Sequence, residues 1–233
     1  MAVAEGSVAG CGVGEYRYEA TSVEGFVQQL AVSYLKNHYW LYVRGEVPEE
    51  KDPERVDEKL LAKYPIAVSK WSRARAKKRG DARLQYLRYR RTFVILSTFS
   101  ARDCAHPLFE AEERTAIKDA RETPIHFYGY SVSYKDGHPH VRIAEVQFRV
   151  LVDAFMGSAL SASADALAAW FVALPFEPYA PVKLQLRKLL GKVNRARRTA
   201  GLERVPVSCL RVNRLTVRPF ESLPAAPLAK LGL

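Results

Sequence analysis

Cysteine is scarce in this chain of 233 residues. Cys11, Cys104 and Cys209 lie far apart, and no two of them have the C-x-x-C spacing. Disulfide frameworks and zinc sites need cysteines in larger or closer sets, so we expect neither. Free thiols are typical of a reducing compartment, and we therefore expect a cytoplasmic protein whose main function uses no cofactor.

Long apolar segments and nucleotide-binding glycine motifs are also missing. No run of about 18 apolar residues is present, which predicts that the chain does not cross a membrane. Residues 1–18 contain glycine and glutamate but no apolar stretch of the kind that a secretory signal has. Neither a P-loop nor Gly-x-Gly-x-x-Gly follows an expected strand, so no nucleotide-binding motif is recognised.

Acidic residues are few relative to basic ones. The chain has 25 Asp and Glu against 36 Lys and Arg, a formal net charge of +11. At this size such a charge favours a polyanionic partner or an anionic membrane surface. Two short stretches hold much of the excess: residues 70–91 contain ten cations and one acid, and residues 183–198 contain seven cations and no acid.

The first basic stretch, KWSRARAKKRGDARLQYLRYRR, combines cations with aromatic rings. We expect a helix that Gly80 ends, followed by a strand over 84–89 whose two faces each carry an aromatic ring and a cation. Rings that stack on bases and cations that contact phosphates are typical of a nucleic-acid surface. The side chains expected to make these contacts are Trp71, Arg73, Arg75, Lys77, Lys78, Arg79, Tyr86, Arg88, Tyr89, Arg90 and Arg91.

The second basic stretch is predicted as an amphipathic helix that Pro181 begins and Gly201 ends. Such a helix can lie along a phosphate backbone or enter a major groove, where Gln185 and Asn194 would read base edges. Its inward stripe is expected to be Val182, Leu186, Leu189, Leu190 and Val193. The cations expected to contact nucleic acid are Lys183, Arg187, Lys188, Lys192, Arg195 and Arg198.

Apolar periodicity and capping residues predict the elements of the first half of the chain. Ser22 caps a first helix, and Asp52 with Pro53 starts another. Helices are expected over 23–37, 53–64 and 66–79, and strands over 38–45, 84–89 and 92–99. The segment 109–121 fits either a helix or an irregular connection. The acids Asp57, Glu58, Glu112, Glu113 and Asp119 lie in acidic stretches, where a solvated face is expected.

The clearest local prediction is a β-hairpin over 125–143 with Asp136-Gly137 as its two-residue turn. Counting outward from this turn gives the cross-strand pairs. One face should be polar, with the pairs Lys135–His138, Ser133–His140 and Ser131–Arg142. The other should pack on the core, with Tyr134–Pro139, Val132–Val141 and Tyr130–Ile143.

After the hairpin the pattern becomes helical. We expect helices from about residue 145, over 163–174 (very apolar and buried) and over 181–201, then a last strand over 211–220. The fold class is α+β, with a mixed or antiparallel sheet in residues 21–145 and a helical part over 146–205. Residues 21–220 are expected to form a single domain, with a flexible arm over 1–20 and a flexible tail over 221–233.

His138 and His140, in the stretch His138-Pro139-His140, are spaced so that both could bind one metal ion. Residues i and i+2 of a strand point to the same face. The pattern resembles the His-hydrophobe-His strand of rolling-circle nickases and related transposases, although proline stands in the middle here. The resemblance implies a divalent metal, magnesium or manganese, that polarises a phosphate while a tyrosine attacks it. Glu145 would be the third ligand, and the candidate nucleophiles are Tyr179 or, upstream, Tyr16, Tyr18 and Tyr34.

We therefore expect a DNA- or RNA-binding protein, rather than an enzyme, that uses residues 70–91 and 183–198. Arg142, beside the two histidines, favours phosphate contact on that hairpin face without catalysis. One alternative is a metal-dependent enzyme that cuts nucleic-acid strands with His138 and His140. Another is an adaptor whose basic surface meets an acidic protein partner.

Overall fold

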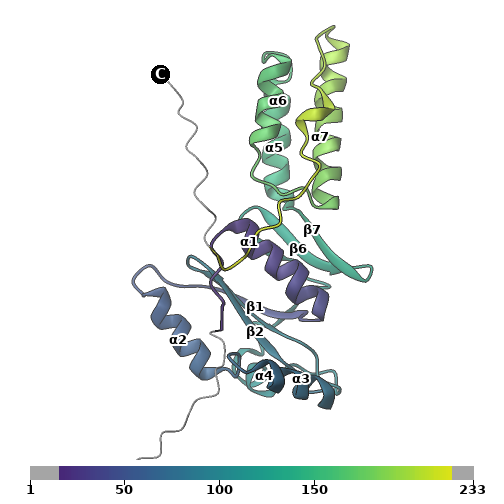
Figure 1. The fold of residues 1–233 in the computed structure, drawn as a ribbon. Coiled ribbons are helices and arrows are strands. Elements are labelled where there is room, and N and C mark those ends of the chain that lie inside the picture. The colour runs from purple at the N-terminus through teal and green to yellow at the C-terminus, as the bar shows by residue number, and fades with distance from the viewer. Residues whose placement is uncertain (1–15, 222–233) are drawn as a thin grey trace, which may run out of the picture.

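The structure, a computed structural model, describes residues 16–221, which form two antiparallel sheets, helices packed beside them and a lobe of three further helices. Figure 1 shows both sheets in the lower part of the molecule and the three helices extending upward from them. The predicted arm up to residue 15 and the predicted tail from residue 222 lie outside the described residues. Residues 16–20 lie along the first sheet, where Tyr16 and Glu19 contact its edge strand.

The first sheet contains four strands in the order β2-β3-β1-β4. They are β1 (Leu41–Glu46), β2 (Leu84–Tyr89), β3 (Thr92–Ser97) and β4 (Lys118–Asp119). The side chains of Val94, Ile95 and Leu96 on β3 are all buried, as the uninterrupted apolar run predicts for a strand covered on both faces. The three strands predicted for this part of the chain are present. β1 begins at Leu41 instead of His38, whose left-handed φ of 68° ends the preceding helix, and β3 ends at Ser97 instead of Phe99.

Residues 23–37 are helical, as predicted, but only the first part is an α-helix. α1 (Val23–Gln28) continues as a π-helical segment, η1 (Gln29–Tyr34), and a 3₁₀ turn, η2 (Leu35–Asn37). Ser22 is the N-cap, and its Oγ accepts a hydrogen bond from the backbone N–H of Gly25 at 3.0 Å. The apolar side of this helix lies in a core shared by the two sheets, where Phe26 clusters with Leu87 of the first sheet and stacks on Phe127 of the second with ring centroids 3.8 Å apart.

Three further helices lie beside the first sheet: α2 (Pro53–Lys63), α3 (Lys70–Arg79) and α4 (Pro107–Glu113). Asp52 caps α2 and Ser69 caps α3, while Gly80 ends α3 in the left-handed conformation with φ of 76°. The segment 109–121, open from the sequence, is helical to Glu113 and then leads without regular structure to β4.

The second sheet is the predicted hairpin with one short strand added. It contains β5 (Ile125–Phe127), β6 (Tyr130–Lys135) and β7 (His138–Ile143) in this order. Every predicted pair between β6 and β7 is present, from Lys135–His138 to Tyr130–Ile143. Asp136 and Gly137 have φ of 51° and 80°, the two positive values of a type I′ turn, so the turn chemistry determines the register.

The helical lobe consists of α5 (Glu145–Ser158), α6 (Ala164–Ala173) and α7 (Ala180–Thr199). α7 buries the predicted stripe from Val182 to Val193 and also Arg197. The Arg197 guanidinium donates to the carbonyl oxygens of Ala159 and Ala162 at 2.8 and 2.7 Å, which holds the end of α7 to the α5–α6 connection. Across residues 16–221, no helix has the length and apolar character that a bilayer crossing requires.

Two predictions for the C-terminal half are corrected. α6 buries Leu167 and Phe171 but exposes Trp170 and Val172, because other helices cover only one side of it. Residues 211–220 do not form the predicted strand. Side chains hydrogen-bond the backbone of this segment instead of a neighbouring strand. The Gln28 amide donates to the carbonyl oxygen of Val217 at 2.7 Å, and the Glu177 carboxylate accepts from the N–H of Leu215 at 2.9 Å.

One large core joins the first helix, both sheets and the lobe. It includes Phe26, Leu87, Phe127, Phe155 and Leu189. A smaller cluster between β2, β3, α2 and α4 includes Leu84, Tyr86 and Phe109. The antiparallel sheets followed by a helical part confirm the predicted α+β class.

Candidate nucleic-acid interface

α3 presents a dense positive surface. Six of its ten residues are Lys or Arg, none is acidic and none is buried. Trp71 in its first turn is 78% exposed, the most exposed of the large apolar side chains described. A single exposed apolar side chain is common on protein surfaces, so exposure alone does not mark Trp71. Its position among the cations of α3 makes it a candidate for stacking on a base.

Capping interactions, and few packing contacts, hold α3 in place. The Oγ of Ser69 accepts from the N–H of Ser72 at 3.2 Å, and the N–H of Asp81 donates to the carbonyl of Ala76 at 3.0 Å. Arg79 pairs with the Asp81 carboxylate at 2.7 Å. Within residues 16–221 the other cations of the helix have no carboxylate partner; these are Lys70, Arg73, Arg75, Lys77 and Lys78.

The predicted contact residues Tyr86 and Arg88 are buried, which removes them from the nucleic-acid surface. Both point toward Asp57 of α2, whose carboxylate is 0% exposed. It accepts from the Tyr86 hydroxyl at 2.5 Å and from Arg88 Nε at 2.7 Å. Burial raises the pKa of the Tyr86 hydroxyl and of the Asp57 carboxyl. The expectation that Asp57 lies on a solvated acidic face is therefore also corrected.

Of the predicted contact residues Tyr89, Arg90 and Arg91 at the β2–β3 turn, only Arg90 is exposed to solvent. Arg90 is exposed, with its guanidinium 5.3 Å from the centroid of the Tyr89 ring. Tyr89 is half-buried and packs against Phe127. Arg91 donates to carbonyl oxygens of the loop 47–51, including that of Glu49 at 2.9 Å, so its predicted phosphate contact is replaced by a structural one.

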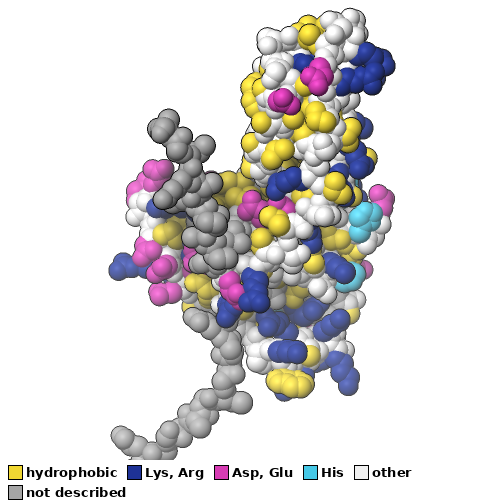
Figure 2. All heavy atoms as spheres, turned by 45° about the horizontal axis from the view of Figure 1, so that its top comes forward, with side chains coloured by type: hydrophobic (Ala, Val, Ile, Leu, Met, Phe, Trp, Pro, Cys, Tyr) yellow, Lys and Arg dark blue, Asp and Glu magenta, His cyan; other side chains and the backbone are white. Residues whose placement is uncertain are grey.

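The outward side of α7 carries the second predicted set of cations. Lys183 is half-buried, while the remaining predicted residues are exposed: Arg187, Lys188, Lys192, Arg195 and Arg198. Figure 2 shows Lys and Arg along the edge of the lobe on which α7 lies in Figure 1, and again on the lower part of the molecule.

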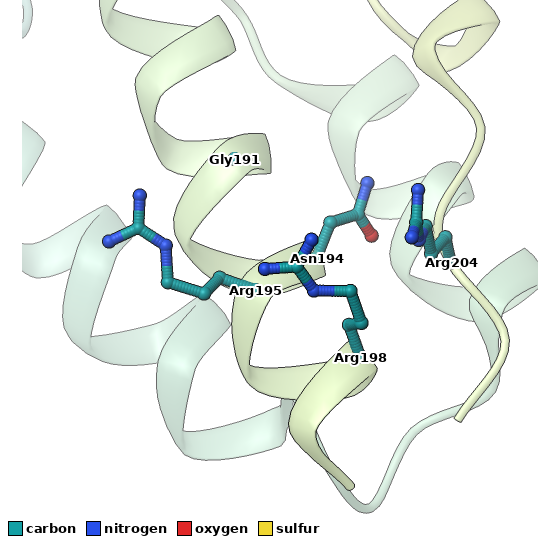
Figure 3. A pocket seen from close by; sticks show the side chains of 5 residues that line it. All are labelled: Gly191, Asn194, Arg195, Arg198 and Arg204. Carbon is teal, nitrogen blue, oxygen red and sulfur yellow. The ribbon is translucent and has the colours of Figure 1, made fainter. Parts of the chain in front are cut away.

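Near its C-terminal end α7 forms one side of a shallow hollow of about 280 Å³. Three guanidinium groups line it, from Arg195, Arg198 and Arg204, together with Gly191 and Asn194 (Figure 3). Arg204 comes from the segment that folds back after Gly201, and it was missing from the prediction because it lies outside both basic stretches. The sequence signal that could have identified Arg204 is its position three residues after Gly201, the predicted end of the basic helix.

Gln185 and Asn194 do not have the predicted free amides. Gln185 bonds the backbone of Ile143, accepting from its N–H at 2.8 Å and donating to its carbonyl at 3.0 Å. Asn194 makes the same two bonds with Val205, at 2.8 and 2.9 Å. Each side-chain amide thus bonds both the N–H and the carbonyl of one residue, as a paired strand would. These bonds connect α7 to other segments and leave neither amide free to read bases.

The histidine pair lies as predicted on β7, on the same face as Ser131, Ser133 and Arg142. His138 is exposed and His140 is half-buried; burial lowers the pKa of His140, and the nearby cations act in the same direction. Glu145, the expected third ligand, pairs with Arg142 at 3.2 Å. In the described chain, no three His, Cys, Asp or Glu side chains come together as a metal site.

The candidate nucleophiles have other surroundings. Tyr179 is half-buried, with the Arg214 guanidinium 4.9 Å from its ring centroid, and burial raises its pKa. The Tyr16 hydroxyl donates to Gln85 at 2.8 Å, and Tyr34 is buried in the core. Tyr18 stacks on Tyr16. On the histidine face Ser131 and Ser133 are buried and Arg142 pairs with Glu145, so His138 and the exposed part of His140 are what this face presents to solvent.

No protein-family model matches the chain, and no curated sequence is significantly similar to it.

Proposed function

We propose that this protein binds nucleic acid, with α3 as the principal contact. The observation that supports this most strongly is the exposure of that helix. A ten-residue helix with six cations, no acid and no buried residue gains little from packing and is destabilised by its own charge repulsion. A polyanion laid along it would relieve that repulsion and release counterions.

Trp71 gives this surface a second kind of contact. Its exposed indole can stack on an unpaired base, while the neighbouring cations contact the backbone on either side. In a duplex both faces of each internal base are already stacked on neighbouring bases, so Trp71 cannot stack on them. Single-stranded DNA or RNA is therefore the preferred ligand in this proposal.

α7 provides an additional phosphate surface. Arg195, Arg198 and Arg204 surround one hollow without a carboxylate in its lining, an arrangement that suits the oxygens of a phosphate. Figure 1 places α3 in the lower part of the molecule and α7 in the lobe at the opposite end. A single ligand that reaches both must therefore run along the whole molecule.

The salt dependence of binding tests this proposal. Five unpaired cations on α3 correspond to a slope of log affinity against log salt of roughly −3.5 for a single strand. Replacing Lys77 and Lys78 by Gln should reduce the slope by about 1.4, measured by fluorescence anisotropy of labelled oligonucleotides. The matched control is the double change of Lys51 and Lys59 to Gln, which removes the same charge from exposed positions away from α3.

The Trp71→Ala variant tests the stacking contact separately. It should weaken single-strand binding by about 1–3 kcal/mol and leave the salt slope unchanged, because no charge is lost. Affinity that is independent of salt, or equal salt slopes for the Lys77/Lys78 variant and its control, would contradict the proposed role of α3.

A second candidate function, binding of an acidic protein partner, is favoured by a different feature. An open groove of about 640 Å³ lies between α5 and α7, and its lining combines the apolar Val152, Met156 and Leu160 with the cations Lys192 and Arg195. Apolar side chains between cations complement an amphipathic helix with acidic flanks. A second copy of this chain fits less well, because it would bring the same cations together.

The probe for this second function is a helical peptide with leucine on one face and glutamate beside it. It should bind in calorimetric titration, and Met156→Glu should abolish binding. A peptide with lysine in place of glutamate should not bind; equal affinity for the two peptides would contradict charge complementarity as the basis of recognition.

A further inference from the structure

The side of α3 that faces the protein covers a cavity lined by both apolar and cationic residues instead of packing on a core. The cavity has a volume of about 220 Å³ and lies between α3, the start of β2 and the residue before α4. From α3 the lining includes Ser72, Arg73, Ala76 and Arg79, so two guanidinium groups lie where an ordinary amphipathic helix would place apolar side chains. Arg83 and His106 line the opposite side.

Two nitrogen atoms of these cavity-lining residues are buried without a hydrogen-bond partner among the described residues. They are Nε of Arg83 and Nδ1 of His106. A buried polar atom left without a partner is destabilising, and such atoms are rare in native structures. Two residues that line one cavity therefore have donor capacity that no described residue satisfies, and an acceptor group that enters the cavity could use it after a small shift of the two side chains.

The residues around the cavity are held in place without that ligand. The N–H of Arg83 donates to Thr98 Oγ1 at 3.0 Å, and its guanidinium lies 5.3 Å from the centroid of the Tyr39 ring. The N–H of His106 donates to Ser97 Oγ at 3.2 Å. A site whose donors are oriented before binding loses less entropy when a ligand enters.

The charge of the lining favours an anion. Three arginines, Arg73, Arg79 and Arg83, line the cavity. Its lining holds one carboxylate, that of Asp81, which pairs with Arg79. Arg83 Nε can only donate a hydrogen bond, and the His106 ring donates from Nδ1 in one tautomer or when protonated. An apolar ligand would leave both atoms unpaired, whereas a tetrahedral oxyanion offers acceptor oxygens to several donors at once.

We propose that this cavity binds a phosphate group, with Arg73, Arg83 and His106 as its donors. The volume of about 220 Å³ is below the roughly 300–1,000 Å³ of sites for drug-sized ligands, so it suits a phosphate and not a whole nucleotide. The phosphate has two possible sources: a free phosphate ion, or the terminal phosphate of an oligonucleotide bound along α3. Only the second source rests on the proposed nucleic-acid function.

Inorganic phosphate is the first probe. Calorimetric titration at constant ionic strength should show saturable binding by the unaltered protein, and Arg73→Gln should weaken it at least about tenfold. Arg75→Gln is the matched control, because Arg75 belongs to the same helix but does not line the cavity. Arg83→Gln provides a second variant on the other side, with thermal unfolding as the check that both variants are folded.

Oligonucleotides of one sequence with a phosphate at the 5′ end, at the 3′ end or at neither end form the second arm. A terminal phosphate should increase affinity several-fold, and Arg83→Gln should remove this difference while affinity for the unphosphorylated strand persists. Phosphate binding without discrimination between the oligonucleotides would identify the free ion as the ligand.

The outcomes separate this inference from the proposed function. Equal binding of all three oligonucleotides, together with no saturable binding of phosphate, would overturn the inference and leave nucleic-acid binding intact. An Arg75→Gln variant that loses phosphate affinity as strongly as Arg73→Gln would also overturn it, because diffuse charge and not the cavity would then be responsible. If no oligonucleotide binds but phosphate does, only the proposed function fails.

Discussion

Replacing Arg88 should destabilise the fold in a way that depends on pH, because Arg88 is the cationic partner of the buried Asp57. Arg88 is 3% exposed, and its Nε lies 2.7 Å from the Asp57 carboxylate. It also pairs with Glu19 at 3.0 Å and donates to the carbonyl of Arg90 at 2.7 Å. The variant Arg88→Met keeps most of the side-chain volume and removes only the charge and these hydrogen bonds.

The size of the effect follows from the carboxylate that is left behind. Removing one partner of a buried ion pair is typically destabilising by about 3–5 kcal/mol. Protonation of Asp57 limits that loss, since neutralising an aspartate of unfolded pKa roughly 3.9 requires about 4 kcal/mol at pH 7 and about 1.5 kcal/mol at pH 5. We therefore expect Arg88→Met to lower the free energy of unfolding by about 3–4 kcal/mol at pH 7, and by about 2 kcal/mol less at pH 5.

Urea-induced unfolding at the two pH values, followed by circular dichroism, measures this effect. The double variant Asp57→Asn with Arg88→Met should recover much of the loss at pH 7, because no charge remains buried. Arg187→Met, on the exposed side of α7, is the control and should change stability by less than about 0.5 kcal/mol. A loss below about 1 kcal/mol at pH 7, or the same loss at both pH values, would refute the reasoning.

Three further predictions concern the hairpin and its contacts. Gly137→Val should destabilise the protein by about 1–3 kcal/mol, because φ of 80° opposes a β-branched residue although no atom obstructs its Cβ; Gly157→Ala, equally unobstructed but helical, should stabilise it by up to about 1 kcal/mol in urea unfolding. Gln185→Leu removes both hydrogen bonds to Ile143 and should lower stability by about 1–3 kcal/mol, with increased hydrogen exchange of the Ile143 amide as the specific readout. Burial lowers the pKa of His140 in the folded state. The unfolded chain therefore binds more protons, so this residue's contribution to stability is complete above about pH 6.5 and declines below it. His140→Gln should reduce the slope of stability against pH in that range, and an unchanged slope would exclude His140 as its source.

The sequence predicted best where the cause of a structure is local. Asp136-Gly137 requires two positive φ values, and this alone set the register of β6 and β7 residue by residue. Ser22 and Asp52 cap their helices because the side-chain oxygen reaches an N–H two or three residues away. The buried run of β3 was equally readable, since apolar residues without alternation need cover on both faces.

Polar residues were misplaced where the partner is distant in the chain. Asp57 and Arg88 both have the composition of surface residues, and only the approach of α2 to β2 brings them together as a buried pair. Gln185 and Asn194 on a basic helix fit base readout as well as they fit a bond to a neighbouring backbone. Which hydrogen-bond partner an amide finds depends on what packs beside it.

The excess of positive charge and the elements that carry it were determined by the sequence, because charge is a property of composition and helical periodicity is a property of spacing. Only the tertiary structure decided which of those charges face solvent. It buried Arg88 and Arg197 against carboxylate and carbonyl oxygens, bonded Arg91 to a loop, and brought Arg204 back beside α7. It also set α3 over a cavity instead of a core, since the arrangement of β2, α3 and His106 depends on contacts between segments that the local sequence does not specify.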